Sequence, residues 1–172
     1  MLRAAGAAAV IIASTAIGYG MGRELSNRIR SLRELGRVAD ILKAEIQYAG
    51  TPLQEIFREI AKRTTGSFAA MFRDVADKME QRDGKTLGTI FKECIQELPA
   101  ETGLTGNDKM QLEGLGTRLG YLDSRMQIQT IERFKEELKR EQEEAEGDYR
   151  QKVRVYRCLG FLGGVFLTLL LL

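Results

Sequence analysis

Two uncharged apolar stretches lie at the ends of this chain, residues 4–22 and 158–172, and nearly every charged residue lies between them. The first lies between Arg3 and Arg23; as a helix it reaches roughly 28 Å, close to the ~30 Å hydrocarbon thickness of a bilayer. We therefore predict a transmembrane helix at residues 1–22. A cleaved signal peptide is the alternative, but the apolar run is longer than a signal sequence requires and continues into a helical pattern.

The second stretch, residues 158–172, would form only about 22 Å of helix, which is short for a full crossing. It can still cross, because Arg154 and Arg157 can extend toward one interface and the bilayer can thin locally. The alternative is a terminal helix buried in a soluble core. Residues 161–172 have no polar side, so a soluble fold would have to cover them on every side, and we predict a second span.

Basic residues flank the inner ends of both stretches and predict the orientation of the chain. The inner flanks carry Arg23, Arg28, Arg30, Arg33 and Arg37 after the first stretch, and Arg150, Lys152, Arg154 and Arg157 before the second. Because Lys and Arg resist translocation, both flanks place the middle domain in the cytoplasm and both termini on the other side. These residues also attract anionic membrane lipid. With 26 basic and 24 acidic residues, the chain has no net field that would recruit nucleic acid.

Residues 23–157 form one domain in which apolar residues recur at helical spacing. The first helix continues out of the first span and ends at Gly50; the second starts with Thr51 as N-cap, followed by Pro52 and Gln54. Further helices follow Thr65-Gly66-Ser67, start at Leu87, cover residues 107–119, and start at Asp123 or Ser124 with a buried stripe of Met126, Ile131, Phe134 and Leu138. We predict an all-α fold, an antiparallel six-helix bundle whose first and last helices extend into the membrane.

The sequence shows no catalytic grouping, because its many carboxylates fall on the polar faces of the expected helices. The chain has no histidine, which removes the commonest general base and metal ligand. Cys94 and Cys158 show no metal or redox spacing, and we assign Cys94 to the core and Cys158 to the membrane interface. The glycine-rich stretch 114–120 matches neither a dinucleotide-binding nor a phosphate-loop pattern. The sequence therefore predicts no catalytic residue, cofactor or metal, and a protein that is not an enzyme.

Glycines recur four residues apart inside both apolar stretches, at Gly18 and Gly22 and again at Gly160 and Gly164. This spacing of small residues lets membrane helices approach closely, either within one chain or between copies in a homo-oligomer. Glycine is common in such helices, so composition alone is the other explanation of the pattern.

Three segments, taken in order, resemble those of a known family. They are Lys43-Ala44-Glu45-Ile46-Gln47-Tyr48 running into Thr51-Pro52-Leu53, the turn Leu115-Gly116-Thr117-Arg118-Leu119-Gly120 followed by Asp123, and the tail Leu159-Gly160-Phe161-Leu162-Gly163-Gly164 followed by leucines. In order and spacing, over essentially the whole chain, they resemble the stage III sporulation protein AB family. That family is found in endospore-forming bacteria and is similar to the cytoplasmic F domain of platform proteins of type II secretion systems and type IV pili.

The resemblance implies a non-enzymatic platform subunit in the mother-cell membrane that surrounds the forespore. It implies membership of a secretion-like channel between the two cells, together with other stage III channel proteins. It also implies that the helical domain docks a sporulation ATPase on the cytoplasmic side. The alternative is a membrane-tethered helical sensor or signalling protein, which would need a folded domain on the far side of the membrane.

Two turns carry residues that are candidates for partner docking. The first comprises Glu45, Gln47, Tyr48 and Thr51, and the second comprises Gly116, Arg118, Gly120 and Asp123. The alternative is that these residues serve the fold itself, because helix caps and tight turns use Gly, Asp and Thr. The sequence leaves both explanations open at both turns.

Overall fold

The computed structural model describes the backbone of residues 2–121 and 123–171, and the side chains of residues 23–121 and 123–151. Its elements are α1 (Leu2–Ala44), the π-helical turn η1 (Glu45–Ala49), α2 (Leu53–Arg63), α3 (Gly66–Gln81), α4 (Leu87–Gln96), the 3₁₀ turn η2 (Ala100–Thr102), α5 (Gly106–Leu119) and α6 (Ser124–Leu171). The described residues contain six α-helices and no strand, which confirms the predicted all-α bundle.

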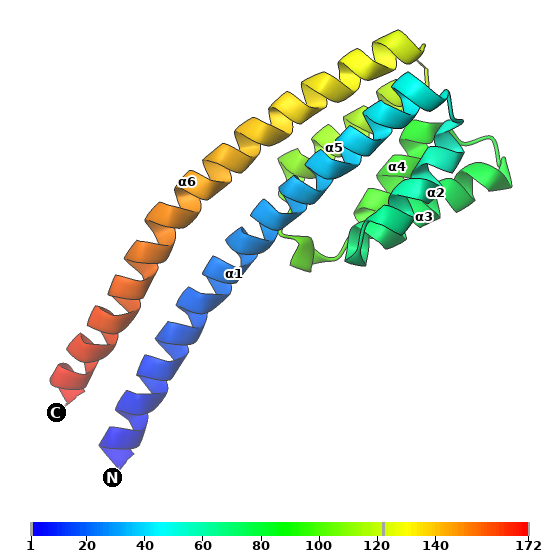
Figure 1. The fold of residues 1–172 in the computed structure, drawn as a ribbon. Coiled ribbons are helices and arrows are strands. Elements are labelled where there is room, and N and C mark those ends of the chain that lie inside the picture. The colour runs from blue at the N-terminus through cyan, green and yellow to red at the C-terminus, as the bar shows by residue number, and fades with distance from the viewer. Residues whose placement is uncertain (1, 122, 172) are drawn as a thin grey trace.

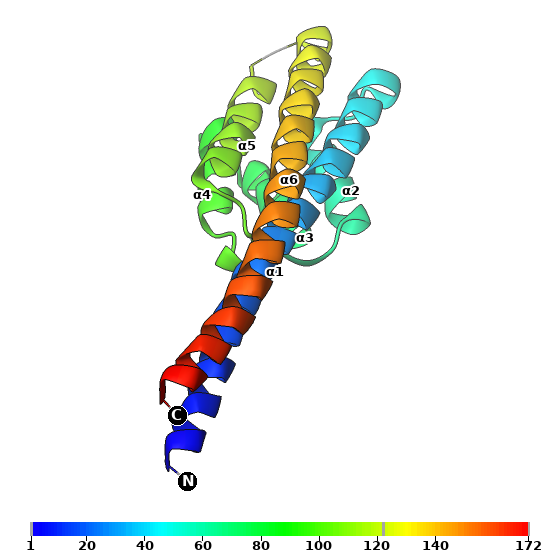
Figure 2. The ribbon, with the colours of Figure 1, turned by 90° about the vertical axis from the view of Figure 1, so that its left-hand side faces the viewer.

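The two long helices, α1 and α6, lie side by side and antiparallel (Figure 1). They contain 43 and 48 residues, so they reach about 64 Å and about 72 Å. The short helices pack as two hairpins, α2 with α3 and α4 with α5, against the part of this pair that is remote from the termini (Figures 1 and 2). The free ends of α1 and α6 therefore project together beyond the short helices.

Three phenylalanines from consecutive helices form the centre of the core. Phe57 in α2, Phe72 in α3 and Phe91 in α4 are each at most 1 % exposed. The Phe57 ring meets the Phe91 ring edge-on at 5.3 Å and stacks near the Phe72 ring at 6.0 Å, separations at which aromatic pairs attract. The long helices close the core with buried apolar residues that include Leu32, Leu35, Leu42, Ile131, Phe134 and Leu138.

Glycine and capping residues set several helix ends where the sequence predicts them. Gly50 follows η1 with φ of 59°, a left-handed conformation that glycine adopts without a steric penalty. The start of α5 has a reciprocal capping box of Thr105 and Asp108, a cap that the sequence prediction of a helix over residues 107–119 did not include. Asp123 caps α6, because its carboxylate accepts a hydrogen bond from the backbone N–H of Met126 at 2.9 Å.

Two details of the prediction are wrong. Thr51 does not cap α2, which begins after Pro52 without a side-chain cap; the Thr51 hydroxyl instead donates to Glu45 over 3.4 Å. Met126 does not belong to the buried stripe of α6. Its side chain is 50 % exposed, because it lies in the first turn of the helix, before Ile131, which is the first fully buried apolar residue of α6.

The two predicted transmembrane segments, residues 1–22 and 158–172, lie outside the residues whose side chains the structure describes. The same holds for the predicted packing glycines Gly18, Gly22, Gly160 and Gly164. Over residues 23–121 and 123–151, no helix is long and apolar enough to cross a membrane. The domain boundaries at residues 22/23 and 157/158 stay a prediction.

Candidate functional site

The first predicted docking turn lies at the end of α1 that is remote from the termini. There the α-helix changes to the π-helical turn η1, a rare conformation that is often found at functional sites. Ile46 is buried, whereas Gln47 is exposed and Tyr48 has 81 % of its surface open to solvent. A tyrosine that exposed contributes nothing to the core, so its side chain is available to a partner.

The remaining two residues of this turn make local contacts. Glu45 is half-buried and accepts from the Thr51 hydroxyl, and its carboxylate lies 3.8 Å from the guanidinium of Arg63 in α2. These contacts hold the connection between η1 and α2. The structure therefore divides the first set into two exposed residues and two that join neighbouring elements.

The second predicted docking turn divides in a similar way. Gly116 lies inside α5 and is buried; a Cβ there would lie 2.3 Å from the Phe91 ring, so this glycine serves the packing of α5 on α4. Gly120 is the C-cap of α5, and Asp123 caps α6. Arg118 is exposed and, among the described side chains, has no ion-pair partner.

Two exposed apolar residues lie beside the second turn: Tyr121, which the sequence pattern did not single out, and Met126, which that pattern assigned to the core. Tyr121 is 71 % exposed and Met126 is 50 % exposed. The signal available in the sequence was the presence of large apolar residues next to a capping turn, where no core can cover them. We use the name distal surface for five exposed residues at the end remote from the termini (Figure 1): Gln47 and Tyr48 of η1, Arg118 in the last turn of α5, Tyr121 between α5 and α6, and Met126 in the first turn of α6.

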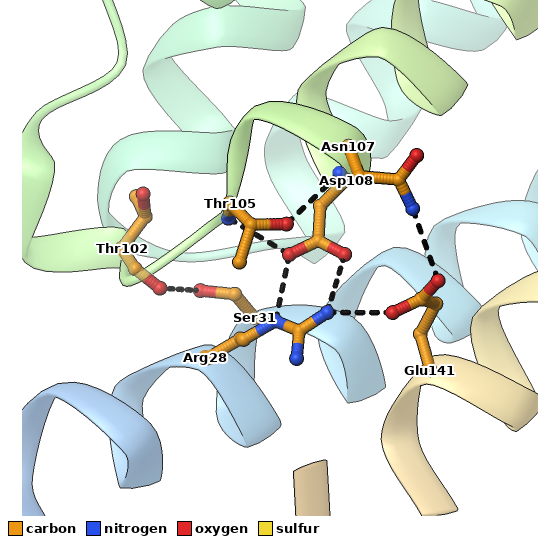
Figure 3. Close-up of polar contacts among 7 residues, drawn as sticks. All are labelled: Arg28, Ser31, Thr102, Thr105, Asn107, Asp108 and Glu141. Carbon is orange, nitrogen blue, oxygen red and sulfur yellow. Dashed lines mark hydrogen bonds and ion pairs between the residues drawn. The ribbon is translucent and has the colours of Figure 1, made fainter. Parts of the chain in front are cut away.

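An ionic cluster joins α1, α5 and α6 at the start of α5, the end opposite to the distal surface. Figure 3 shows its side chains. Arg28 of α1 donates two hydrogen bonds of 2.8 Å to the carboxylate of Asp108 in α5 and one of 2.7 Å to Glu141 of α6. Asn107 donates to the other oxygen of Glu141 at 3.0 Å. The guanidinium thus lies between two carboxylates, in the bidentate geometry that gives the strongest side-chain ion pairs.

Burial makes this cluster matter for stability. The Asp108 side chain has no exposed surface, and those of Arg28 and Glu141 are 15 % and 11 % exposed. Burial opposes the charged form of Asp108, but hydrogen bonds from Arg28 and Thr105 outweigh it and lower the pKa of Asp108 below its ordinary value. The hydrogen bonds to Asp108 likewise raise the pKa of Arg28, so both groups stay charged.

Beside this cluster, the backbone of the η2 segment packs closely against the backbone of α1. Gly103, just after η2, has φ of 68°, and a Cβ there would lie 2.6 Å from the carbonyl oxygen of Glu24 and 2.8 Å from the amide nitrogen of Arg28. Ser31 of α1 donates to the carbonyl oxygen of Thr102 at 2.8 Å. Only glycine allows the η2 segment to approach α1 this closely, so the cluster and the loop together fix α5 against the long helices.

The described side chains offer no grouping of three or more Cys, Asp or Glu residues that could hold a metal ion. Cys94 is a free, buried thiol in α4, as assigned, and burial raises its pKa. The described residues thus form two candidate sites, an exposed distal surface and a buried ionic cluster.

Comparison with known proteins identifies the family. The family model for stage III sporulation protein AB matches residues 3–172. The chain belongs to the stage III sporulation protein AB family. A curated relative, stage III sporulation protein AB of Bacillus subtilis (strain 168), is 27 % identical over 172 residues, which cover 100 % of both chains.

A solved structure of a stage III sporulation protein AB has the same fold. It superposes with a TM-score of 0.65 at 24 % identity, covering 72 % of this chain and 96 % of that one. The family model and the curated relative confirm the resemblance found in the sequence, and with it the link to sporulation.

Proposed function

We propose that this protein is a non-enzymatic platform subunit of a secretion-like channel between mother cell and forespore, assembled with other stage III proteins. Family membership over residues 3–172 supports a role in sporulation. The observation that carries the platform role is the distal surface, where Tyr48 and Tyr121 are 81 % and 71 % exposed without belonging to any core. Exposed tyrosines are enriched among the residues that dominate protein–protein binding energy.

The proposal places residues 1–22 and 158–172 in the mother-cell membrane as two spans, with membrane lipid around them and residues 23–157 in the cytoplasm. Two features support this arrangement. The helices that contain the two apolar stretches run antiparallel and project from the same end of the molecule (Figure 1). The basic residues that flank both stretches indicate a cytoplasmic middle domain.

In this arrangement the distal surface is the part of the protein farthest from the membrane. A cytoplasmic ATPase that docks there would be clear of the lipid headgroups. Tyr48, Tyr121 and Met126 offer apolar contact area, and Arg118 offers a charge without a partner among the described residues. This combination of aromatic residues, Met and Arg is enriched in the centres of protein interfaces.

The test is binding of the sporulation ATPase of the same organism to the full chain in detergent. We expect the Y48A/Y121A double variant to bind at least about tenfold more weakly, because truncated hot-spot tyrosines commonly cause losses of that size. M110A is the matched control: Met110 is 64 % exposed, but it lies in the first half of α5, away from the distal surface. Equal binding by the double variant and M110A, with unchanged helical content, would contradict docking at the distal surface.

A further inference from the structure

A second charged feature lies where α1 and α6 leave the short helices. Residues 24–37 of α1 and 141–150 of α6 form this part, which we call the neck. Between the two helices the neck contains a cavity of about 530 Å³, whose polar lining includes Ser26, Arg30, Arg33, Arg37, Tyr149 and Arg150. Neither docking turn contributes to it, and neither do the residues of the buried ionic cluster.

The neck cavity carries an excess of positive charge. Four arginines line it against two carboxylates, Glu34 and Glu146. Glu34 pairs with Arg37 at 3.1 Å, and Glu146 is shared by Arg33 at 2.6 Å and Arg150 at 3.8 Å. Among the described residues Arg30 has no ion-pair partner, and its side chain is exposed. The cavity therefore has a formal charge of +2, with both carboxylates already engaged.

The adjoining groove along the same pair of helices shows that this excess is local. That groove shares Arg33 and Arg37 with the cavity and continues toward the distal end. The other two cations of the groove each have an ion-pair partner: Lys135 pairs with Asp40, and Lys139 lies 4.0 Å from Glu143. Near its far end Lys43 and Glu132 pair at 2.6 Å. The unbalanced arginines thus gather at the neck, on the side of the molecule nearer the termini.

The distance of the cavity from the predicted membrane boundary, measured along the two helices, indicates which ligands can reach it. Arg30 lies eight positions after residue 22, and Arg150 lies eight positions before residue 158. At about 1.5 Å per residue both arginines stand about 12 Å above the predicted hydrocarbon boundary, one on each helix. The polar headgroup region occupies the first ~5–8 Å of that distance, and a long arginine side chain can extend across the remaining distance toward the headgroups.

We propose that the neck cavity binds a phosphate group and that an anionic phospholipid of the surrounding membrane supplies it. Guanidinium groups match the oxygens of a phosphate in bidentate geometry, and the hydroxyls of Ser26 and Tyr149 are further donors in the lining. The lipid would fix the neck against the membrane surface. This proposal rests on the membrane location given under the proposed function.

The test is lipid binding to the purified full chain in dodecyl maltoside, followed by native mass spectrometry and by the midpoint of thermal unfolding. The probes are phosphatidylglycerol, zwitterionic phosphatidylcholine and inorganic phosphate. The variant R30Q/R150Q removes one arginine from each helix. R73Q/R125Q removes two exposed arginines outside the cavity that have no ion-pair partner in the described part of the chain.

We expect phosphatidylglycerol to bind and stabilise the wild-type chain and R73Q/R125Q alike. We expect R30Q/R150Q to bind it about twenty-five-fold more weakly, about fivefold for each arginine lost. Unchanged affinity in R30Q/R150Q, or equal stabilisation by phosphatidylcholine, would overturn the site. Stabilisation by inorganic phosphate alone would support a phosphate site but overturn the lipid as its source.

Membrane fractionation of the same variants separates this proposal from the proposed function. If R30Q/R150Q sediments with the membrane but retains the wild-type affinity for phosphatidylglycerol, the neck site is overturned and the membrane location stands. If the wild-type chain itself does not sediment with the membrane, the location is overturned, and with it the lipid.

Discussion

At the scale of single residues, the buried ion pair between Arg28 and Asp108 is the interaction whose loss by point mutation should lower the stability of the fold most. The side chain of Asp108 is fully buried and accepts two hydrogen bonds from Arg28 and one from the backbone of Thr105. Replacing it with asparagine removes the charge but keeps the shape, and leaves the guanidinium with Glu141 as its only carboxylate partner. We expect D108N to lower the free energy of unfolding by about 3 kcal/mol.

Denaturant unfolding of the full chain in detergent, followed by far-ultraviolet circular dichroism, measures this loss. E144Q is the matched control, because Glu144 is an exposed carboxylate of α6 with no ion pair among the described residues. It should change the free energy of unfolding by less than about 0.5 kcal/mol. Equal effects of D108N and E144Q would mean that the cluster contributes no more than a surface charge.

The same pair makes stability depend on pH in a defined direction. The pKa of Asp108 is lowered in the folded chain, so the folded state favours the ionised carboxylate. Its contribution is therefore fully present above the unfolded pKa of about 3.9 and is lost as the pH falls through the lower folded value. We expect the difference in free energy of unfolding between wild type and D108N to be constant from about pH 5 to about pH 7 and to shrink below about pH 4. A difference that stays constant through the acid range would exclude Asp108 as its source.

At the scale of elements, two glycines inside helices predict opposite effects of the same substitution. In α5, a Cβ on Gly116 would lie 2.3 to 2.6 Å from three atoms of Phe91, so G116A should lower the free energy of unfolding by about 2 kcal/mol. In α1, a Cβ on Gly36 would meet no atom within 4 Å, so G36A should raise it by about 0.5–1 kcal/mol through helix propensity. Thermal unfolding of both variants tests the pair. A stabilised G116A would show that α4 and α5 can separate at no cost.

The order and ends of the helices could be predicted because their signals are local. Gly50 and Asp123 act on their own neighbours, so the sequence places them correctly. Thr51 was misassigned because Glu45, six residues earlier, accepts its hydroxyl, and only the turn geometry of η1 brings the two together. A π-helical turn has no sequence signature in a single chain, so the change from α1 to η1 could not be predicted.

The candidate sites were harder to predict because their residues meet only in the folded chain. Arg28 and Asp108 are 80 positions apart, and Arg28 and Glu141 are 113 apart. The sequence shows each as one charge on a polar helix face, and nothing in the spacing distinguishes a buried charge from a solvated one. Met126 fitted the apolar stripe of α6, and its exposure follows from where that helix first contacts the core.

At the scale of the whole molecule, ion pairs link α1 to α6 from the neck to the distal end. Arg33 pairs with Glu146 at the neck, Asp40 with Lys135 further along, and Lys43 with Glu132 beside η1. Partly exposed pairs of this kind each contribute little to stability, but together they restrict sliding of one helix along the other. The neck and the distal surface are therefore held at a fixed separation along the same two helices.

The proposed membrane arrangement predicts which parts of the chain a membrane-impermeant maleimide can reach. In a C94A/C158A background, a single cysteine at the exposed position of Glu144 should react only after lysis, because residues 23–157 lie in the cytoplasm in this arrangement. When the chain is expressed in non-sporulating cells, so that it inserts into the plasma membrane, a single cysteine at Leu2 should react in intact cells, because both termini then lie on the outer side.

The two positions test different parts of the arrangement. Labelling of E144C in intact cells would place the middle domain outside the cytoplasm and remove the distal surface from the reach of any cytoplasmic ATPase. Protection of L2C until lysis, with E144C also protected, would mean that the first apolar stretch does not cross. The second stretch would then be the only span that attaches the chain to the membrane. In that case R30Q/R150Q should release the chain from the membrane more readily than R73Q/R125Q, because the proposed lipid contact at the neck would carry more of the attachment.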